Sequence, residues 1–350
     1  MFDLLRASSR SLPASFALML VFSASAHAGS IYVATHGTDS GSCGPKTDPC
    51  RSITQGITNA AVGGSIVVGP GQYGDVDQDG TPGEAGEEPL AACSLGSCLL
   101  RIDKQVTITS SDGAFATVID GGPSVVAMAV GIDVEGAVFG DRNKGFTIKA
   151  PAAPGAGIMT SAANVVIAGN VIQAGSSFFG MYVGNDGTQI LGNRILGNTL
   201  GYGMYVQGNS AVVTGNVVTG ANLGFVIAGS NSVLTGDVAT GGIIGLVLSG
   251  TGTTASRCSF LGNVTAGIAV DNAGTTATLT ECNIVGNGTY APMATCGFDG
   301  NGSAVTVKDS YWGSATGPGA DPADATCDAA PGSTTPFATK PITVKLKGIR

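Results

Sequence analysis

Gly157-Ile158-Met159-Thr160 is the first of six similar four-residue phrases in the middle of the chain. The others are Gly180-Met181-Tyr182-Val183, Gly203-Met204-Tyr205-Val206, Gly224-Phe225-Val226-Ile227, Gly245-Leu246-Val247-Leu248 and Gly267-Ile268-Ala269-Val270. Their glycines lie 23, 23, 21, 21 and 22 residues apart. This period is too short for a repeat of paired helices and is typical of a solenoid whose coils consist of short strands. The repeat therefore predicts an all-β solenoid.

Each phrase alternates with the two-residue period of a strand, so its side chains divide into an inward and an outward set. The inward set is Ile158, Met181, Met204, Phe225, Leu246 and Ile268, together with Thr160, Val183, Val206, Ile227, Leu248 and Val270. The outward set is Met159, Tyr182, Tyr205, Val226, Val247 and Ala269. The inward set predicts the solenoid core.

A second series of residues follows the same intervals, and each member comes just after a glycine. It consists of Asn170, Asn193, Asn216 and Asp237. Stacked amides at a turn can hydrogen-bond along the stack, as they do in cross-β assemblies. The register continues to Cys258 and Cys282. Coils stack about 4.8 Å apart, within the Cα separation of a disulfide, roughly 4.4 to 6.8 Å, so we predict a Cys258–Cys282 bond.

Residues 1–28 have the pattern of a secretory signal peptide. Arg6 and Arg10 precede an apolar run that ends at Ala26-His27-Ala28, an A-x-A cleavage site. Without these residues, which hold two of the 16 basic and one of the 24 acidic residues, the net charge is −9. Acidic chains bind polyanions poorly, so we expect no nucleic-acid partner. We expect an exported protein, extracellular, at the cell surface or in the periplasm, with no membrane span after cleavage.

Eight cysteines in an exported chain favour disulfides over metal ligation, because no C-x-x-C occurs. Apart from the stacked pair, neighbours in the sequence suggest Cys43 with Cys50, Cys93 with Cys98 and Cys296 with Cys327.

We divide the remaining chain into an N-terminal cap (29–64), a solenoid (65–310) with an acidic insertion (74–98), and a C-terminal cap and tail (311–350). Ser52-Ile53-Thr54-Gln55 has the form of a capping box, which predicts a short helix in the N-terminal cap. Solenoids need such caps to cover the open apolar end of the first coil.

Several short motifs resemble bacterial right-handed parallel β-helix repeat proteins of the pectin-lyase-like superfamily. They are Tyr32-Val33-Ala34, Gly37-Thr38-Asp39, Pro49-Cys50-Arg51-Ser52-Ile53, Ala60-Ala61, Gly69-Pro70-Gly71-Gln72-Tyr73, Tyr311-Trp312-Gly313 and Gly317-Pro318. The resemblance implies a right-handed single-stranded parallel β-helix. The superfamily includes lyases, hydrolases, epimerases and surface proteins, and the motifs of its best-known enzymes do not occur here.

Groups suited to catalysis are few in the regular repeats. A lyase needs a base and a group that neutralises a uronate carboxylate. Between Ala150 and Val307 the basic residues are Arg194 and Arg257. Asp271 with Arg257 and Arg194 is one candidate set, and Lys308 with Asp309 is another. The alternative for Asp271 is an ordinary turn residue, because Asp271-Asn272 is a common turn pair.

The outward set offers a candidate binding surface. Tyr182 and Tyr205 occupy the same position in adjacent coils, next to Met159. Tyrosine combines a flat apolar ring with a hydroxyl group, and exposed apolar patches often mark binding sites. We expect a platform for a polysaccharide or a cell-surface glycan. The alternative is that the acidic insertion or the C-terminal tail covers the stripe.

The acidic insertion contains a candidate calcium site. Asp75, Asp77 and Asp79, followed by Gly80, match the pattern D-x-D-x-D-G. The twelfth position of that pattern is Gly86, so Glu84, Glu87 or Glu88 would have to supply the missing carboxylate. The alternative is a solvated acidic loop without a cation.

The sequence thus favours a secreted β-helix that binds a glycan or a cell-surface partner through an outer sheet face. The alternatives are a lyase or glycoside hydrolase acting on an acidic polysaccharide, and a structural protein of the cell surface or envelope.

Overall fold

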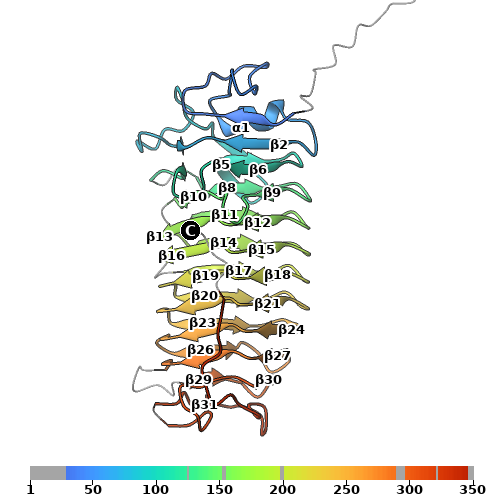
Figure 1. Ribbon diagram of the computed structural model, residues 1–350, viewed down its shortest axis with the longest axis vertical. Helices are drawn as coiled ribbons and strands as arrows, with labels where there is room; N and C mark the ends of the chain where they lie inside the picture. The colour runs from blue at the N-terminus through green and yellow to red at the C-terminus, as the bar shows by residue number, and fades with distance from the viewer. Residues whose placement is uncertain are drawn as a thin grey trace, which may run out of the picture.

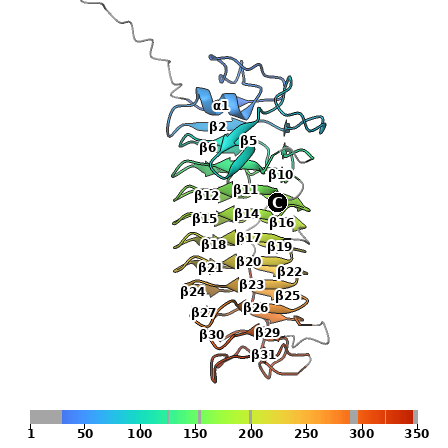
Figure 2. The same cartoon turned by 180° about the vertical axis from the view of Figure 1, so that it is seen from behind.

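The computed structural model describes residues 29–123, 126–151, 155–197, 201–288, 296–320 and 322–345. They form a right-handed parallel β-helix, seen in Figure 1 as a rod of stacked coils with α1 near one end and β31 at the other. Figure 2 shows the rod from behind. Each regular coil contributes one strand to each of three sheets, so neighbours in a sheet are about one repeat apart in the sequence. The predicted fold is confirmed.

Sheet I contains β4 (Ala91–Cys93), β5 (Gly96–Ile102), β8 (Met128–Ile132), β11 (Ala156–Thr160), β14 (Phe179–Val183), β17 (Tyr202–Val206), β20 (Leu223–Ile227), β23 (Ile244–Leu248), β26 (Ala266–Val270), β29 (Cys296–Asp299) and β31 (Thr326–Cys327). Sheet II contains β1 (Ile31–Val33), β2 (Ser65–Val68), β6 (Thr107–Ser110), β9 (Val138–Phe139), β12 (Val166–Ala168), β15 (Gln189–Leu191), β18 (Val212–Thr214), β21 (Val233–Thr235), β24 (Thr251–Ser256), β27 (Thr276–Thr280) and β30 (Ala304–Lys308). Sheet III contains β3 (Gly71–Gly74), β7 (Thr117–Asp120), β10 (Thr147–Lys149), β13 (Val171–Gly175), β16 (Arg194–Gly197), β19 (Val217–Thr219), β22 (Val238–Thr240), β25 (Ser259–Leu261) and β28 (Asn283–Val285).

The predicted inward set forms the core. Met181 pairs with Ile158 on one side and with Met204 on the other, and the same register continues to Ile268. These side chains are fully buried, and the inward residues two positions later in each strand are also buried, with Val270 the most exposed of them at 5%. Each coil therefore closes its apolar face against the next coil, which a single coil cannot do alone.

The recurring glycine of each phrase is required by close approach of the backbone. A Cβ on Gly180 would lie 2.6 Å from the carbonyl oxygen of Gly203 and 2.6 Å from the side chain of Ile195. A Cβ on Gly203 would likewise lie 2.7 Å from the carbonyl oxygen of Gly224. Any side chain here would push adjacent coils apart, so the glycine recurs once per coil.

The predicted asparagine ladder is confirmed in the turn between sheets II and III. Oδ1 of Asn193 accepts a hydrogen bond from the backbone N–H of Asn170 (3.0 Å), and Oδ1 of Asn216 accepts one from the N–H of Asn193 (2.8 Å). Nδ2 of Asn193 donates to the Ile167 carbonyl oxygen at 2.9 Å. The ladder thus satisfies buried backbone groups that solvent cannot reach.

Asp237 continues the ladder with a carboxyl group. Its Oδ1 accepts from the backbone N–H of Asn216 at 2.8 Å and from Nδ2 of Asn216 at 2.9 Å. The side chain is fully buried, and this burial raises the pKa of the Asp237 carboxyl to about 7. The structure therefore favours a protonated carboxyl here at a pH where an exposed aspartate is ionised.

The predicted Cys258–Cys282 disulfide is wrong in this structure, where both residues are buried free thiols. Each Sγ donates to the carbonyl oxygen two residues earlier in its own coil, Ser256 at 3.5 Å and Thr280 at 3.4 Å. In-register stacking repeats the same side-chain orientation in each coil. Each thiol is therefore engaged with a carbonyl of its own coil and does not bond across to the next coil, as a disulfide requires. A hydrogen bond with Cys282, followed by burial, raises the pKa of the Cys258 thiol.

The other three disulfides are formed as the sequence suggested. They join Cys43 to Cys50, Cys93 to Cys98 and Cys296 to Cys327.

A second polar ladder was not predicted. It lies in the turn between sheets III and I, where Oδ1 of Asn287 accepts from the backbone N–H of Asn263 at 3.0 Å. Asp324 extends it by accepting from the N–H of Asn287. The signal was present in the sequence as Leu261-Gly262-Asn263 and Val285-Gly286-Asn287, which are 24 residues apart.

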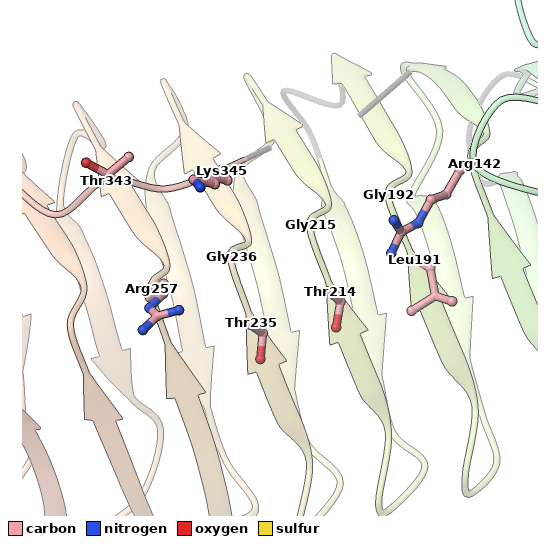
Figure 3. Close-up of a pocket in the computed structure, with 10 residues that line it drawn as sticks. All are labelled: Arg142, Leu191, Gly192, Thr214, Gly215, Thr235, Gly236, Arg257, Thr343 and Lys345. Carbon is pink, nitrogen blue, oxygen red and sulfur yellow. The ribbon is translucent and has the colours of Figure 1, made fainter. Parts of the chain in front are cut away.

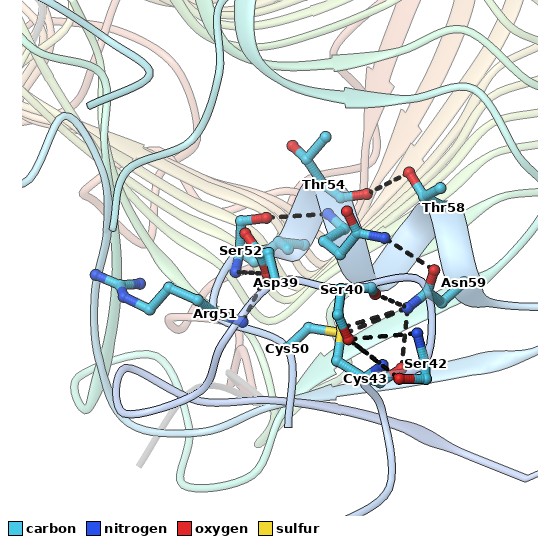
Figure 4. The surroundings of a disulfide bond; sticks show 12 residues. Asp39, Ser40, Ser42, Cys43, Cys50, Arg51, Ser52, Thr54, Thr58 and Asn59 are labelled. Atoms are coloured by element: carbon cyan, nitrogen blue, oxygen red, sulfur yellow. Dashed lines mark hydrogen bonds between the residues drawn. A yellow bond between two sulfur atoms is a disulfide. The ribbon is translucent and has the colours of Figure 1, made fainter. Parts of the chain in front are cut away.

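The N-terminal cap covers the first coil with helix α1 (Ile53–Asn59), whose Ile53 and Ile57 are buried. Figure 4 shows how the Cys43–Cys50 loop is tied to this helix, because Nδ2 of Asn59 donates to the Cys43 carbonyl oxygen at 2.9 Å. The predicted capping box is half formed. Ser52 Oγ accepts from the Gln55 N–H at 3.0 Å, but Asp39 and not Gln55 accepts from the Ser52 N–H, at 2.9 Å.

At the other end, Trp312 is completely buried beneath the last coils. The chain then runs back along the rod over the turns between sheets II and III (Figure 1). Asn283 holds this tail by both ends of its amide, accepting from the Ile342 N–H at 2.8 Å and donating to the Ile342 carbonyl oxygen at 2.9 Å. The predicted signal peptide lies outside the described residues, in which no helix is long and apolar enough to cross a membrane.

We expect Asp237→Asn to stabilise the protein at alkaline pH. The folded-state pKa of about 7 lies above the ordinary 3.8. Asp237 therefore makes its full contribution to the free energy of unfolding below about pH 4. This contribution, at most about 4 kcal/mol, is lost as the pH rises to about 7. An amide has no such titration, but its nitrogen cannot accept the N–H of Thr235 as Oδ2 of Asp237 does at 3.1 Å, which limits the gain.

Urea unfolding of both proteins at pH 4.5 and pH 8 measures this effect (on the order of 1–4 kcal/mol at pH 8). The advantage of the variant should grow with pH. An advantage that is constant across this range, or as large for the exposed control Asp112→Asn, would contradict the assignment.

We also expect two thiols per chain, both inaccessible in the native state. A thiol reagent should not react with the folded protein. After unfolding without reductant it should modify Cys258 and Cys282 alone, which peptide mass spectrometry can locate. Recovery of no free thiol would show that these two residues are bonded after all.

Candidate functional site

An aromatic cluster lies on the outer face of sheet I, across β14 and β17. The rings of Tyr182 and Tyr205 stack with their centroids 5.8 Å apart and an interplanar angle of 9°. Phe179 and Tyr202 form a second stacked pair at 5.2 Å and 21°. Phe178 completes the cluster by an edge contact with Tyr202 and is 45% exposed. We call these five residues the aromatic cluster.

The register of the repeat builds this cluster. Tyr182 is paired with Tyr205 and Phe179 with Tyr202, so equivalent side chains of adjacent coils lie one above the other. The sequence predicted the two tyrosines that follow Gly180 and Gly203, but Phe179 and Tyr202, which precede those glycines, were missed. Their signal was the same repeat, because an aromatic residue comes directly before the glycine in these two phrases.

The rest of the outward stripe is less accessible. Met159 packs against a small buried group that includes Cys98 of the hairpin β4–β5, whose strands are the sole antiparallel neighbours in the described sheets. Cys93 of the same hairpin lies over Gly131, the residue that pairs with Met159. Phe179 packs against the same small apolar group, which includes Cys93 of the hairpin. Val226 is only 5% exposed. The insertion therefore covers the Met159 end of the stripe, and the C-terminal tail lies over a different face.

Polar groups surround the aromatic cluster. The hydroxyl of Tyr182 donates to Oε1 of Gln207. Burial, followed by the neighbouring Tyr182, raises the pKa of the Tyr205 hydroxyl, and Asp271 makes a smaller contribution of the same sign. Asp271 thus belongs to the electrostatic surroundings of this cluster. Its carboxylate accepts a hydrogen bond from Ser249 Oγ at 3.1 Å.

The structure does not bring the proposed catalytic residues into one set. Asp271 follows β26 in the turn between sheets I and II, whereas Arg257 lies between β24 and β25 in the turn between sheets II and III. Arg257 forms an exposed ion pair with Glu281 at 2.7 Å. Arg194 is exposed at the start of β16. Catalysis by these residues stays a prediction.

Lys308 and Asp309 lie at the end of β30, on the same side of the rod as Arg257. The backbone carbonyl of Lys308 accepts from the N–H of Glu281, and the N–H of Asp309 donates to the carbonyl of Pro336 at 2.7 Å. Their backbones therefore connect the last coil to the tail. No contact between their side chains is found in the described part of the chain.

A groove of about 420 Å³ runs along the turns between sheets II and III. Figure 3 shows Arg142 near one end, Arg257 near the other, and Lys345 of the C-terminal tail above the floor. Thr214 and Thr235 line the groove between the two arginines (Figure 3). The groove gathers three cations in an acidic protein, and the sequence analysis identified only Arg257 among them.

The acidic insertion folds so that its predicted ligands come together. Oxygen atoms of Asp75, Asp77 and Glu87 all lie within 4.8 Å of one another, and the same holds for Asp77, Asp79 and Glu84. Asp77 belongs to both groups, which joins all five predicted carboxylates into one cluster.

Glu88 has a different role from its neighbours. Its carboxylate accepts hydrogen bonds from the backbone N–H groups of Ile53 (2.6 Å) and Thr54 (3.0 Å), and from the hydroxyl of Thr54 (2.6 Å). It therefore caps the first turn of α1 and anchors the insertion to the N-terminal cap. Burial raises the pKa of the Glu88 carboxyl despite these donors.

Comparison with known proteins identifies the architecture. The family model of the right-handed β-helix region matches residues 182–316. The solved structure of pectate lyase Pel9A is similar, with a TM-score of 0.52, 14% identity, and coverage of 74% of this chain and 71% of the lyase. A rhamnogalacturonan lyase structure matches with a TM-score of 0.36 and 14% identity over 86% of this chain and 65% of that one. No curated protein sequence matches significantly. By its coil topology, the chain is a right-handed parallel β-helix, the fold that it shares with the pectate lyase structure.

Proposed function

We propose that this protein is exported and binds a glycan at the aromatic cluster on the outer face of sheet I. The cluster is the observation that carries the proposal. Five aromatic side chains gather over two adjacent coils, in a described chain whose other large apolar residues are mostly buried. Aromatic residues with hydroxyl groups suit ligands that are apolar on one face and polar at the edges, as sugar rings are.

The charge around the cluster favours a neutral sugar over a uronate. The polar groups beside the rings are the amide of Gln207 and the carboxylate of Asp271. An anionic ligand would meet like charge at Asp271. Three disulfides support export, because such bonds persist in oxidising compartments.

We expect the double substitution Tyr182→Ala, Tyr205→Ala to weaken glycan binding at least tenfold, because it removes one stacked pair from the centre of the cluster (roughly 1.4 kcal/mol per factor of ten). Affinity electrophoresis against neutral and acidic polysaccharides, followed by calorimetry with the best ligand, measures the change. Melting temperatures establish that the variant remains folded.

The matched control is Val212→Ala, Val233→Ala. These valines are 38% and 44% exposed on the outer face of sheet II and should leave binding unchanged. Equal affinity of the tyrosine variant and the wild type would remove the basis of the proposal. Binding of no glycan at all would favour a structural role at the cell surface.

A second candidate function is a lyase or hydrolase acting on an acidic polysaccharide. The groove lined by Arg142, Arg257 and Lys345 favours it, because uronate carboxylates need cations opposite them. Pectate lyase Pel9A has the same fold, which supports this candidate at the level of architecture alone.

For this candidate we expect unsaturated or reducing-end products from polygalacturonate, detected by ultraviolet absorbance or a reducing-sugar assay. Arg142→Ala, Lys345→Ala should abolish their formation by removing two cations from the groove, whereas Lys46→Ala in the N-terminal cap should not. Absence of product over a broad panel of uronate polymers, with and without calcium, would exclude this activity.

A further inference from the structure

The acidic insertion has a feature that a solvated loop does not explain. Asp75 is 1% exposed and Glu87 is 9% exposed, yet Oδ1 of Asp75 and Oε2 of Glu87 have no hydrogen-bond partner. Burial of an ionised carboxylate oxygen without a partner is costly. Buried charges are otherwise paired or bind metals.

Backbone hydrogen bonds fix the other oxygen of these carboxylates. Oδ2 of Asp75 accepts from the N–H of Gly80 at 3.0 Å, and Oε1 of Glu87 accepts from the N–H of Val76 at 2.8 Å. Oδ1 of Asp77 likewise accepts from the N–H of Asp79 at 3.1 Å. Each side chain is therefore held in place by one oxygen, while its second oxygen remains available for a ligand.

The loop backbone is shaped for this convergence. Gln78 and Gly80 adopt positive φ angles of 62° and 84°, which turn the chain sharply between successive acidic residues. The N–H of Asp75 donates to the carbonyl of Asp120 in β7, at 3.1 Å. The cluster is thus built on the edge of sheet III and does not extend freely into solvent.

We propose that Asp75, Asp77 and Glu87 bind one calcium ion, with Asp79 and Glu84 completing its oxygen shell. Calcium takes six to eight oxygen ligands at roughly 2.3–2.6 Å, so two oxygens on one ion lie up to about 5 Å apart. Oxygens of Asp75, Asp77 and Glu87 lie within 4.8 Å of one another, as do those of Asp77, Asp79 and Glu84, and both groups fit that span. An all-oxygen, carboxylate-rich shell suits calcium better than zinc or copper, which favour nitrogen and sulfur ligands.

Without a cation, the gathered carboxylates of Asp75, Asp77 and Glu87 repel one another. A divalent cation would replace this repulsion with attraction. Glu87, one residue after Gly86, supplies the carboxylate that glycine cannot.

The test compares melting temperatures of the purified protein in excess chelator and in millimolar Ca²⁺, with calorimetric titration of Ca²⁺ into the chelated protein. We expect a rise of about 3 to 6 °C and binding of one ion. Mg²⁺, which demands near-octahedral geometry, should give a smaller rise. Absence of both heat and a melting shift, or an equal response to Mg²⁺, would overturn the assignment to calcium.

Asp75→Asn and Glu87→Gln should each weaken Ca²⁺ binding at least tenfold. In chelator, however, both variants should melt at or above the wild-type temperature, because each removes one buried, unpaired charge. Asp48→Asn, at an exposed position in the N-terminal cap, removes the same charge and should bind Ca²⁺ like the wild type. Wild-type affinity in both site variants would contradict the proposal. These results do not depend on whether the aromatic cluster binds a glycan.

Discussion

The tight turn between sheets II and III buries backbone groups, and the structure depends on the hydrogen bonds that these groups form. In each coil this turn brings an N–H and a carbonyl group into the interior, where water cannot reach them. Asn170, Asn193 and Asn216 meet the need with one side chain each, since the amide accepts from the coil before it and donates to a strand carbonyl. If these amides were absent, coils stacked this closely would leave buried polar groups unpaired.

Close stacking in turn restricts the sequence in ways that can be read without the structure. Gly180 and its equivalents are required because a Cβ would meet the next coil, and Met181 and its equivalents must be apolar because they face the core. The period of the glycines, the inward set and the asparagine ladder could therefore be predicted from one repeat unit. The second ladder at Asn263 and Asn287 is shorter, and only two of its members share the Gly-Asn pattern.

Features that depend on side-chain orientation were harder to predict from the sequence. The position of Cys258 above Cys282 was predicted correctly, but the bond was not, because each thiol donates to a carbonyl oxygen of its own coil. The capping box was predicted only in part, because one of its hydrogen bonds is replaced by a tertiary contact. Ser52 caps α1 as expected, but a residue 13 positions earlier, Asp39, takes the place of Gln55 at the Ser52 N–H. Such partners come from tertiary contacts that a local pattern does not contain.

The candidate sites show the same division between repeated and non-repeated sequence. The aromatic cluster lies within the repeat, so its tyrosines were predictable from register. The groove was not, because Arg142 and Lys345 are about 200 residues apart in the chain and meet Arg257 only when the tail folds back along the rod. The repeats thus supply a rigid surface, and the irregular segments add charge to it.

The acidic insertion connects two of these sites within one segment. Its first part holds the carboxylate cluster beside sheet III, and Glu88 then fixes it to α1. Its last part forms the hairpin β4–β5, and Cys98 of β5 belongs to a small buried apolar group against which Met159 and Phe179 pack at the border of the aromatic cluster. A cation that neutralises the carboxylates would order the beginning of a segment whose end forms one edge of the proposed glycan surface. Order at that edge matters for binding, because a ligand loses less free energy when it meets a surface that is already fixed.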